Sequence, residues 1–167
     1  MKKNDDLTLE IGDLVVYPIY GVGEIEDFDT YKVDGSIQDF ILINFKQDKM
    51  KLRIPKDKAS NSGLRKLSNK NRLSKALEVL AEMPAVKKDM WIKRAKEYEK
   101  NINSGDPVLI AEVVRDLHKK EDSLEQQSYS ERQIYLTALN RLSNEYAAVQ
   151  NLDKKAAKVK LEELLNQ

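Results

Sequence analysis

The stretch GDLVVYPIYGVGEI, residues 12–25, sets the character of the first third of the chain. Its valines and tyrosine favour an extended strand, which Pro18 should end because proline lacks the amide hydrogen that a central strand donates. The segment Gly21 to Gly23 is typical of a turn, and the residues after it predict a second extended run. These features indicate that the chain begins with β structure.

The β pattern continues to about residue 55. Asp34-Gly35 is a strong hairpin signal, because both residue types tolerate the left-handed backbone of a tight turn. Residues 39–45 are rich in Ile, Leu and Phe, and residues 50–54 alternate apolar and basic side chains before Pro55. Several short strands joined by tight turns within about 60 residues predict a small curled sheet or barrel.

A change of pattern divides the chain into two predicted domains, residues 1–67 and 68–167. The connector KASNSGLRKLS, residues 58–68, is rich in Ser, Asn and Gly, as loops are. Beyond it, apolar residues recur at helical spacing, and we expect about five helices. The predicted fold class is therefore α+β, with a small N-terminal β barrel followed by an all-α C-terminal domain.

Capping residues predict where three of these helices begin. Asp106 precedes Pro107, and aspartate accepts hydrogen bonds from the first amides of a helix while proline suits its first turn. Ser130 with Gln133 fits a capping box at the start of a longer helix. We expect Asp153 to cap the last helix.

Composition gives catalysis little support. The 167 residues include no cysteine, one histidine (His118) and no apolar run near the roughly 20 residues that span a bilayer. His118 follows an expected helix end, where we expect it to be solvated, and no phosphate-binding glycine loop is present. We therefore expect a cytoplasmic protein that is not an enzyme and uses no cofactor or metal.

Charge is distributed unevenly along a chain whose net charge is only +1. Residues 68–104 carry nine basic and five acidic side chains, whereas residues 1–67 and residues 105–167 each carry more acidic than basic ones. Attraction to phosphate is strongest where positive charge gathers, so we expect any nucleic-acid surface in the middle third.

The segment KKDMWIKRAKEYEK, residues 87–100, is the strongest candidate for such a surface. It holds the only tryptophan, Trp91, and six basic against three acidic residues. Lys93, Lys96 and Lys100 share one helical face. Lysines grip phosphates without regard to sequence, and an apolar ring near a helix start suits insertion into a minor groove or stacking on an unpaired base.

Trp91 also has an ordinary structural interpretation. It falls in line with Ala95, Tyr98 and Ile102 at spacings of four, three and four, which favours a place in the core. A run of charges is, likewise, more often a solvated face than a binding site. Spacing alone favours core packing and leaves the DNA contact open.

Residues 50–54, MKLRI, form the second candidate site. Three apolar side chains should point to one face of a strand, with Lys51 and Arg53 on the other. Charges on an outer face commonly protect a sheet edge from unwanted pairing. Alternatively, an edge strand pairs with a strand of a partner protein. The residues alone favour the protective role and do not exclude the second.

Taken together, these segments resemble the CarD family of bacterial transcription regulators. GDLVVYPIYGVGEI is similar to the family's N-terminal signature, and KLRIP (residues 51–55) to its later strand. The tryptophan helix, followed by SGD and by AEVVRDL (residues 111–117), is similar to the family's helical core. The N-terminal signature is shared with transcription-repair coupling factors, so the helical part discriminates. The resemblance extends from about residue 10 to residue 165.

The resemblance implies a Tudor-like N-terminal barrel that binds the RNA polymerase β subunit, largely through an edge strand. It also implies that the helical domain contacts promoter DNA at the upstream edge of the transcription bubble. The polymerase-binding residues expected on this basis are Arg53, Lys51, Tyr31 and Val33. The DNA-binding residues expected are Trp91, Lys93, Arg94, Lys96 and Lys88.

Three residues depart from the family's pattern. Tyr20 stands where many members have histidine, and Lys93 where arginine is frequent. Tyr31 stands near a position that is basic in some members, which leaves its part in partner binding open.

The function expected is that of a regulator that stabilises the open promoter complex without a chemical step. Binding the open complex more tightly than the closed one would shift the equilibrium between them. DNA contact should be largely independent of sequence, through the minor groove, and we expect a monomer. The alternative is a protein-protein adaptor that binds proteins through both domains, with Trp91 in the core.

Overall fold

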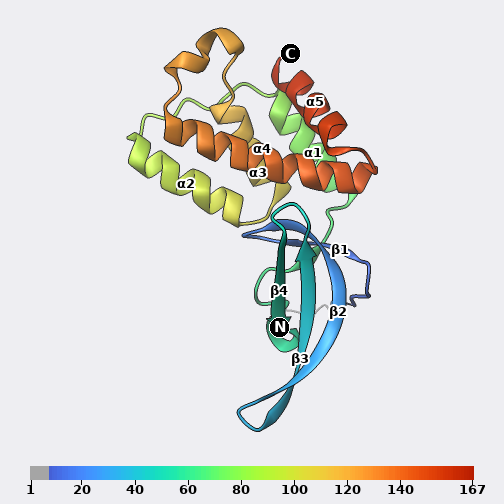
Figure 1. Cartoon of the computed structure of the whole chain (residues 1–167). Helices are drawn as coiled ribbons and strands as arrows, with labels where there is room; N and C mark the ends of the chain where they lie inside the picture. The colour runs from blue at the N-terminus through green and yellow to red at the C-terminus, as the bar shows by residue number, and fades with distance from the viewer. Residues whose placement is uncertain (1–7) are drawn as a thin grey trace. The chain divides into compact units, whose positions relative to one another are not determined.

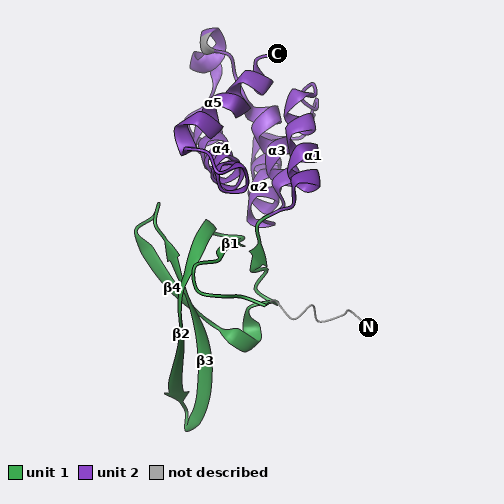
Figure 2. Ribbon diagram, turned by 90° about the vertical axis from the view of Figure 1, so that its right-hand side faces the viewer, with its two compact units in different colours: residues 1–67 green, residues 68–167 purple. Residues whose placement is uncertain are grey.

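The computed structural model describes residues 8–167 and shows strands in the first third of the chain and helices in the rest (Figure 1). The chain divides into a unit that ends at Leu67 and a unit that begins at Ser68 (Figure 2). The α+β class is therefore confirmed.

The first unit is one antiparallel sheet with the strand order β4-β3-β2-β1-β5. Its strands are β1 (Leu14–Tyr17), β2 (Gly21–Val33), β3 (Ser36–Phe45), β4 (Met50–Pro55) and β5 (Arg65–Lys66). Within the described residues, the edge strands β4 and β5 do not pair with each other, so the sheet stays open and the barrel is not confirmed. One physical reason is the length of β5, which offers two residues for pairing.

A long curved hairpin dominates this sheet (Figure 1). Asp34 and Gly35 adopt φ of 51° and 80°, as the hairpin signal predicted, and they join β2 to β3 directly. The pairing register shifts between Ile25 and Asp27, where a bulge increases the bend of β2.

The two-glycine segment is not the turn that the sequence predicted. The turn lies at residues 18–20, and Gly23 sits inside β2 opposite Val15. A Cβ atom on Gly23 would meet Ile43 Cγ2 at 2.6 Å and Phe45 Cε1 at 2.8 Å. Gly23 is therefore required by close packing under β3 rather than by chain reversal.

The inner face of the sheet carries the core of the first unit. Its buried residues are Val15, Ile25, Ile41, Ile43, Phe45, Ile54, Ala59 and Leu64. Residues of β4 alternate between this core and the outer face, as the period of two requires. In β3, Leu42 on the other face is buried as well as the core residues Ile41 and Ile43.

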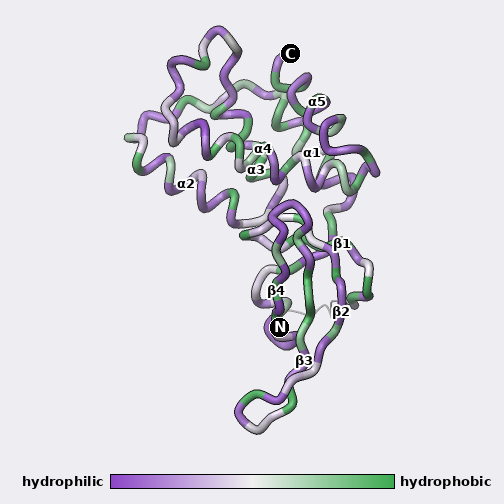
Figure 3. The backbone as a smooth tube through the Cα atoms, viewed as in Figure 1, coloured by the Kyte–Doolittle hydropathy of each residue, from purple (hydrophilic) through white to green (hydrophobic). Residues whose placement is uncertain are grey.

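The second unit contains five α-helices and a short 3₁₀ helix, η2 (Glu121–Gln126), in agreement with the expected number. The helices are α1 (Lys70–Ala81), α2 (Trp91–Asn103), α3 (Pro107–Leu117), α4 (Tyr129–Gln150) and α5 (Lys154–Leu165). Helix α3 is the most apolar: it buries seven of its eleven residues and packs against α1, α2 and α4. Figure 3 shows apolar residues along α3 between more polar neighbouring helices.

Two of the three predicted helix starts are correct. Asp106 accepts a hydrogen bond from the Val108 amide, with Pro107 in the first turn, and α5 begins after Asp153, although that side chain makes no capping hydrogen bond. The predicted start at Ser130 is wrong. Ser128 caps α4 by accepting from the Glu131 amide, because Ser128 to Glu131 already forms a capping-box pattern two residues earlier.

No helix in the described part of the chain is both long and apolar enough to cross a membrane.

Candidate protein and nucleic-acid interfaces

The outer face of the sheet collects the four residues predicted to bind polymerase. Paired residues on neighbouring strands share a face, and Arg53 pairs with Leu42, which pairs with Asp27. Side chains two positions apart on a strand point to the same face. Lys51 on β4 therefore shares this face with Arg53, and Tyr31 and Val33 on β2 share it with Asp27. All four side chains are exposed, and β4 is an edge strand of the sheet, as predicted.

Arg53 is held in place on this face. Its Nε donates to Asp29 Oδ2 over 3.0 Å, and its guanidinium carbon lies 5.6 Å from the centre of the Tyr31 ring. The hydrogen bond to the Asp29 carboxylate, followed by the interaction with Tyr31, raises the pKa of Arg53 above its ordinary value. The guanidinium is thus oriented before any partner arrives.

Lys51 has a similar partner, since its Nζ lies 2.7 Å from Glu26 Oε1. Both basic side chains remain about half exposed, at 56% for Lys51 and 51% for Arg53. Ion pairs between exposed side chains stabilise a fold little. A partner's carboxylate is therefore able to compete for either cation at small cost to the sheet.

Trp91 occupies the first position of α2 and is half-buried. Its indole Nε1–H donates to Ser130 Oγ over 3.0 Å, and its ring centre lies 6.3 Å from that of Tyr98. The Arg94 guanidinium carbon lies 5.3 Å from the centre of the indole ring. The ring is therefore packed against the core without being fully buried in it. Its contact with DNA stays a prediction.

The basic residues of this region separate into two groups. Lys88, Lys93 and Lys96 are exposed, and Lys93 Nζ lies 3.2 Å from Asp89. Arg94, in contrast, is half-buried against Trp91, and its Nε is buried without a hydrogen-bond partner among the described residues. The three lysines thus present their charges to solvent, whereas Arg94 packs against the tryptophan.

The loop before α2, residues 82–90, is anchored on α3 by residues that sequence reasoning missed. The Asp116 side chain, only 3% exposed, accepts from the Ala85 amide at 3.1 Å and from Arg115 Nε at 2.9 Å, and Lys87 Nζ lies 3.8 Å away. Arg115 also reaches Glu82 at 2.9 Å. The sequence did contain a signal for this anchor, the adjacent pair Arg115-Asp116 within AEVVRDL. Charged side chains in an otherwise apolar helix are rarely buried unless they are paired.

His118 was expected to be solvated, but it is partly buried and both ring nitrogens have partners. Its Nδ1 lies 3.0 Å from the Tyr135 hydroxyl and its Nε2 lies 3.0 Å from Asn166 Oδ1. Burial raises the pKa of Tyr135 to about 12, so its hydroxyl keeps its proton near neutral pH. His118 therefore has a structural role. It connects the end of α3 to Tyr135 in α4 and to Asn166, the residue after α5.

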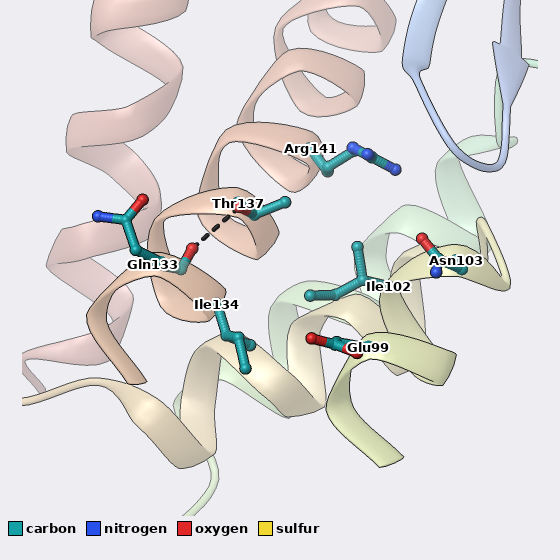
Figure 4. A pocket seen from close by; sticks show the side chains of 7 residues that line it. All are labelled: Glu99, Ile102, Asn103, Gln133, Ile134, Thr137 and Arg141. Atoms are coloured by element: carbon teal, nitrogen blue, oxygen red, sulfur yellow. Dashed lines mark hydrogen bonds between the residues drawn. The ribbon is translucent and has the colours of Figure 1, made fainter. Parts of the chain in front are cut away.

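A pocket of about 250 Å³ lies between α2 and α4 (Figure 4). Ile102 and Ile134 supply apolar walls, and Glu99 and Arg141 contribute charged side chains. The dashed line in Figure 4 is the hydrogen bond from Thr137 Oγ1 to the Gln133 carbonyl, 2.9 Å long. Among the described residues, no group of three acidic, histidine or cysteine side chains is placed to hold a metal ion.

Comparisons with known proteins agree with this two-part organisation. Residues 9–68 match the family model described as CarD-like/TRCF RID domain, and residues 75–162 match the model described as CarD, C-terminal domain. Two such domains in this order define a transcription regulator. The chain belongs to the CarD family.

Two individual proteins are similar to this chain in sequence. A Bacillus subtilis (strain 168) protein named "Putative transcription factor YdeB" is 28% identical over 151 residues, which cover 89% of this chain and 97% of that protein. The solution NMR structure of the 72-residue N-terminal domain of Myxococcus xanthus CarD is 33% identical and covers 36% of this chain and 80% of that one, with a TM-score of 0.32. The family models carry the assignment.

Proposed function

We propose that this regulator binds the RNA polymerase β subunit and promoter DNA together, and that it stabilises the open promoter complex in the bacterial cytoplasm. The match of residues 9–68 to the CarD-like/TRCF RID domain is the observation that carries the proposal. It agrees with the exposed outer face on which Lys51, Arg53, Tyr31 and Val33 gather. No chemical step is involved.

The polymerase contact is proposed to use the outer face of β4 and the hairpin. The exposed Arg53 guanidinium offers N–H donors in a planar fork, which suits carboxylates on a partner. The amides and carbonyls of an edge strand provide a second means of recognition, because a partner strand is able to extend the sheet. The exposed Tyr31 ring and the exposed Val33 side chain add apolar area to this proposed contact surface.

The DNA contact is proposed to lie at the start of α2. Lys88, Lys93 and Lys96 supply positive charge, and the partial positive charge of a helix N-terminus adds to it. Three lysines reach few phosphates, so affinity for DNA alone should be weak. Polymerase binding by the first unit then raises the local concentration of the helical unit near DNA.

The regulatory effect follows from differential binding. If the chain binds the open complex about 1.4 kcal/mol more tightly than the closed one, the ratio of open to closed complex rises about tenfold. The sign of the effect on transcript output depends on which step of initiation is slow at each promoter.

The half-burial of Trp91 favours a second candidate, a protein-protein adaptor whose tryptophan is structural. Fluorescence of the single tryptophan separates the two functions. Under the DNA-binding proposal, promoter DNA presented with RNA polymerase quenches or shifts the emission relative to polymerase alone. An emission that polymerase changes and DNA does not would favour the adaptor.

A further inference from the structure

The first two turns of α5 carry a cluster of positive charge, although residues 105–167 together carry more acidic than basic side chains. The first seven residues of this helix include four lysines and no acidic residue. Lys154, Lys155 and Lys160 are exposed, and Lys158 is half-buried. Lys154 and Lys155 precede Lys158 by four and three residues, so these three lysines share one side of the helix. Within the described part of the chain, none of the four is paired with a carboxylate.

From residue 132 onward, the exposed surface of α4 carries no carboxylate. Residues 132–144 contain no acidic residue, and Glu145 is only 3% exposed. The exposed side chains of this span recur at spacings of four and three and share one face; they are Gln133, Thr137 and Asn140. Amide side chains such as those of Gln133 and Asn140 are among the groups that contact DNA phosphates. Helix α4 therefore presents a polar surface that does not repel phosphates.

This surface connects the basic start of α2 with the basic start of α5. The first turn of α4 binds Trp91 through Ser130, and α5 follows the last turn of α4 after the three residues 151–153. Figure 1 shows α4 between α2 and α5, and α4 packs against both. A helix of 22 residues is roughly 33 Å long. One turn of a DNA duplex is about 34 Å long, so the two basic clusters are about one turn apart.

We infer that Lys154, Lys155 and Lys158 bind the phosphate backbone of the same DNA duplex that α2 contacts, about one helical turn away. The inference deepens the DNA-binding role proposed above and rests on it. Duplex DNA is the partner that the geometry favours, because its backbone returns to the same side of the duplex once in each turn. The contact is independent of sequence, since lysines bind phosphates without reading bases.

The test is the affinity of the full chain for two hairpin-capped duplexes, one of about half a turn and one of about two turns, at several salt concentrations. The triple variant Lys154→Gln, Lys155→Gln and Lys158→Gln should lower the slope of log affinity against log salt on the long duplex by about three units, because three phosphate contacts are lost. On the short duplex the variant should stay within about twofold of the wild type, since a short duplex occupies one cluster at a time. Fluorescence anisotropy of labelled duplexes measures both.

A matched control changes three exposed lysines of the first unit. Lys32→Gln, Lys49→Gln and Lys58→Gln remove the same charge outside the helical unit and should leave the slope on both duplexes unchanged. Glutamine has nearly the helix propensity of lysine. The melting temperature of each triple variant should therefore match the wild type.

Four results would overturn the inference. A folded α5 variant with the wild-type slope on the long duplex would remove the second contact and leave the α2 contact standing. Equal losses in the α5 variant and the control would attribute the effect to overall charge. Loss of polymerase capture by the α5 variant with unchanged DNA binding would assign the lysines to a protein partner. A wild-type chain that binds neither duplex and does not change the lifetime of open complexes with polymerase would overturn both the second contact and the proposed function.

Discussion

The pair of Arg53 with Tyr31 in the first unit and the pair of Arg94 with Trp91 in the second have similar spacing and different surroundings. Arg53 lies 5.6 Å from the Tyr31 ring centre and Arg94 lies 5.3 Å from that of Trp91. The first pair is exposed and its arginine also binds a carboxylate, whereas the second is half-buried and its arginine Nε has no hydrogen-bond partner among the described residues. The first pair is suited to exchange partners, and the second is part of the structure of its unit.

The largest effect is expected at the exposed pair. Arg53→Glu reverses a charge on the outer face and should weaken polymerase binding by about a hundredfold or more, because a partner's carboxylate would meet a like charge. The melting temperature should fall only slightly, since the Arg53 side of the lost ion pair is half exposed, although Asp29 is partly buried. Affinity capture of polymerase by the full-length variants measures the effect.

Lys46→Glu is the control for this prediction. Lys46 forms an exposed pair with Glu24 at 2.8 Å, so the variant makes the same change of charge outside the proposed contact residues. Equal losses in the two variants would attribute the effect to overall charge and would count against a specific surface.

At the half-buried pair of Arg94 and Trp91 we expect a smaller effect, and we expect it on stability rather than on polymerase binding. Trp91→Ala should lower the free energy of unfolding by about 1–3 kcal/mol, between the values for exposed and core positions. Tyr31→Ala, in contrast, should leave stability nearly unchanged and weaken polymerase capture. Denaturant unfolding of both variants makes the comparison, and equal stability losses would contradict it.

The smallest effect concerns salt. Lys96→Ala should reduce the slope of log affinity for DNA against log salt by about one unit, because one phosphate contact is lost. Lys87→Ala should not change that slope. Its Nζ lies over the Tyr98 ring at 4.5 Å and close to Asp116, so its loss should lower stability instead. Titration at several salt concentrations distinguishes the two lysines.

Local signals in the sequence predicted the elements well. The left-handed pair Asp34-Gly35 and the cap Asp106-Pro107 act through their own backbone, so neither depends on distant residues. The alternation of MKLRI also predicted which residues of β4 face outward. Closure of the sheet, in contrast, depends on how β4 and β5 meet, and strand signals contain no information on that.

The candidate site was harder to predict because its contacts join segments far apart in sequence. The spacing of apolar residues did not decide whether Trp91 lies in the core or at the surface. Its ring is held by a hydrogen bond to Ser130, which lies 39 positions away in the sequence. Ser130 is available for this contact because Ser128 takes the capping position. The roles of Asp116 and Arg94 likewise appear only once the helices are packed.

The Asp116 carboxylate has a consequence for hydrogen exchange. Ala85 lies in an exposed loop. Amide hydrogens in such loops ordinarily exchange with solvent through local openings that cost little free energy. Its N–H instead donates to Asp116 on the most buried helix of the unit. That one amide should exchange at a rate set by opening of the contact with α3, and Asp116→Asn should accelerate it while the neighbouring amides keep their rates.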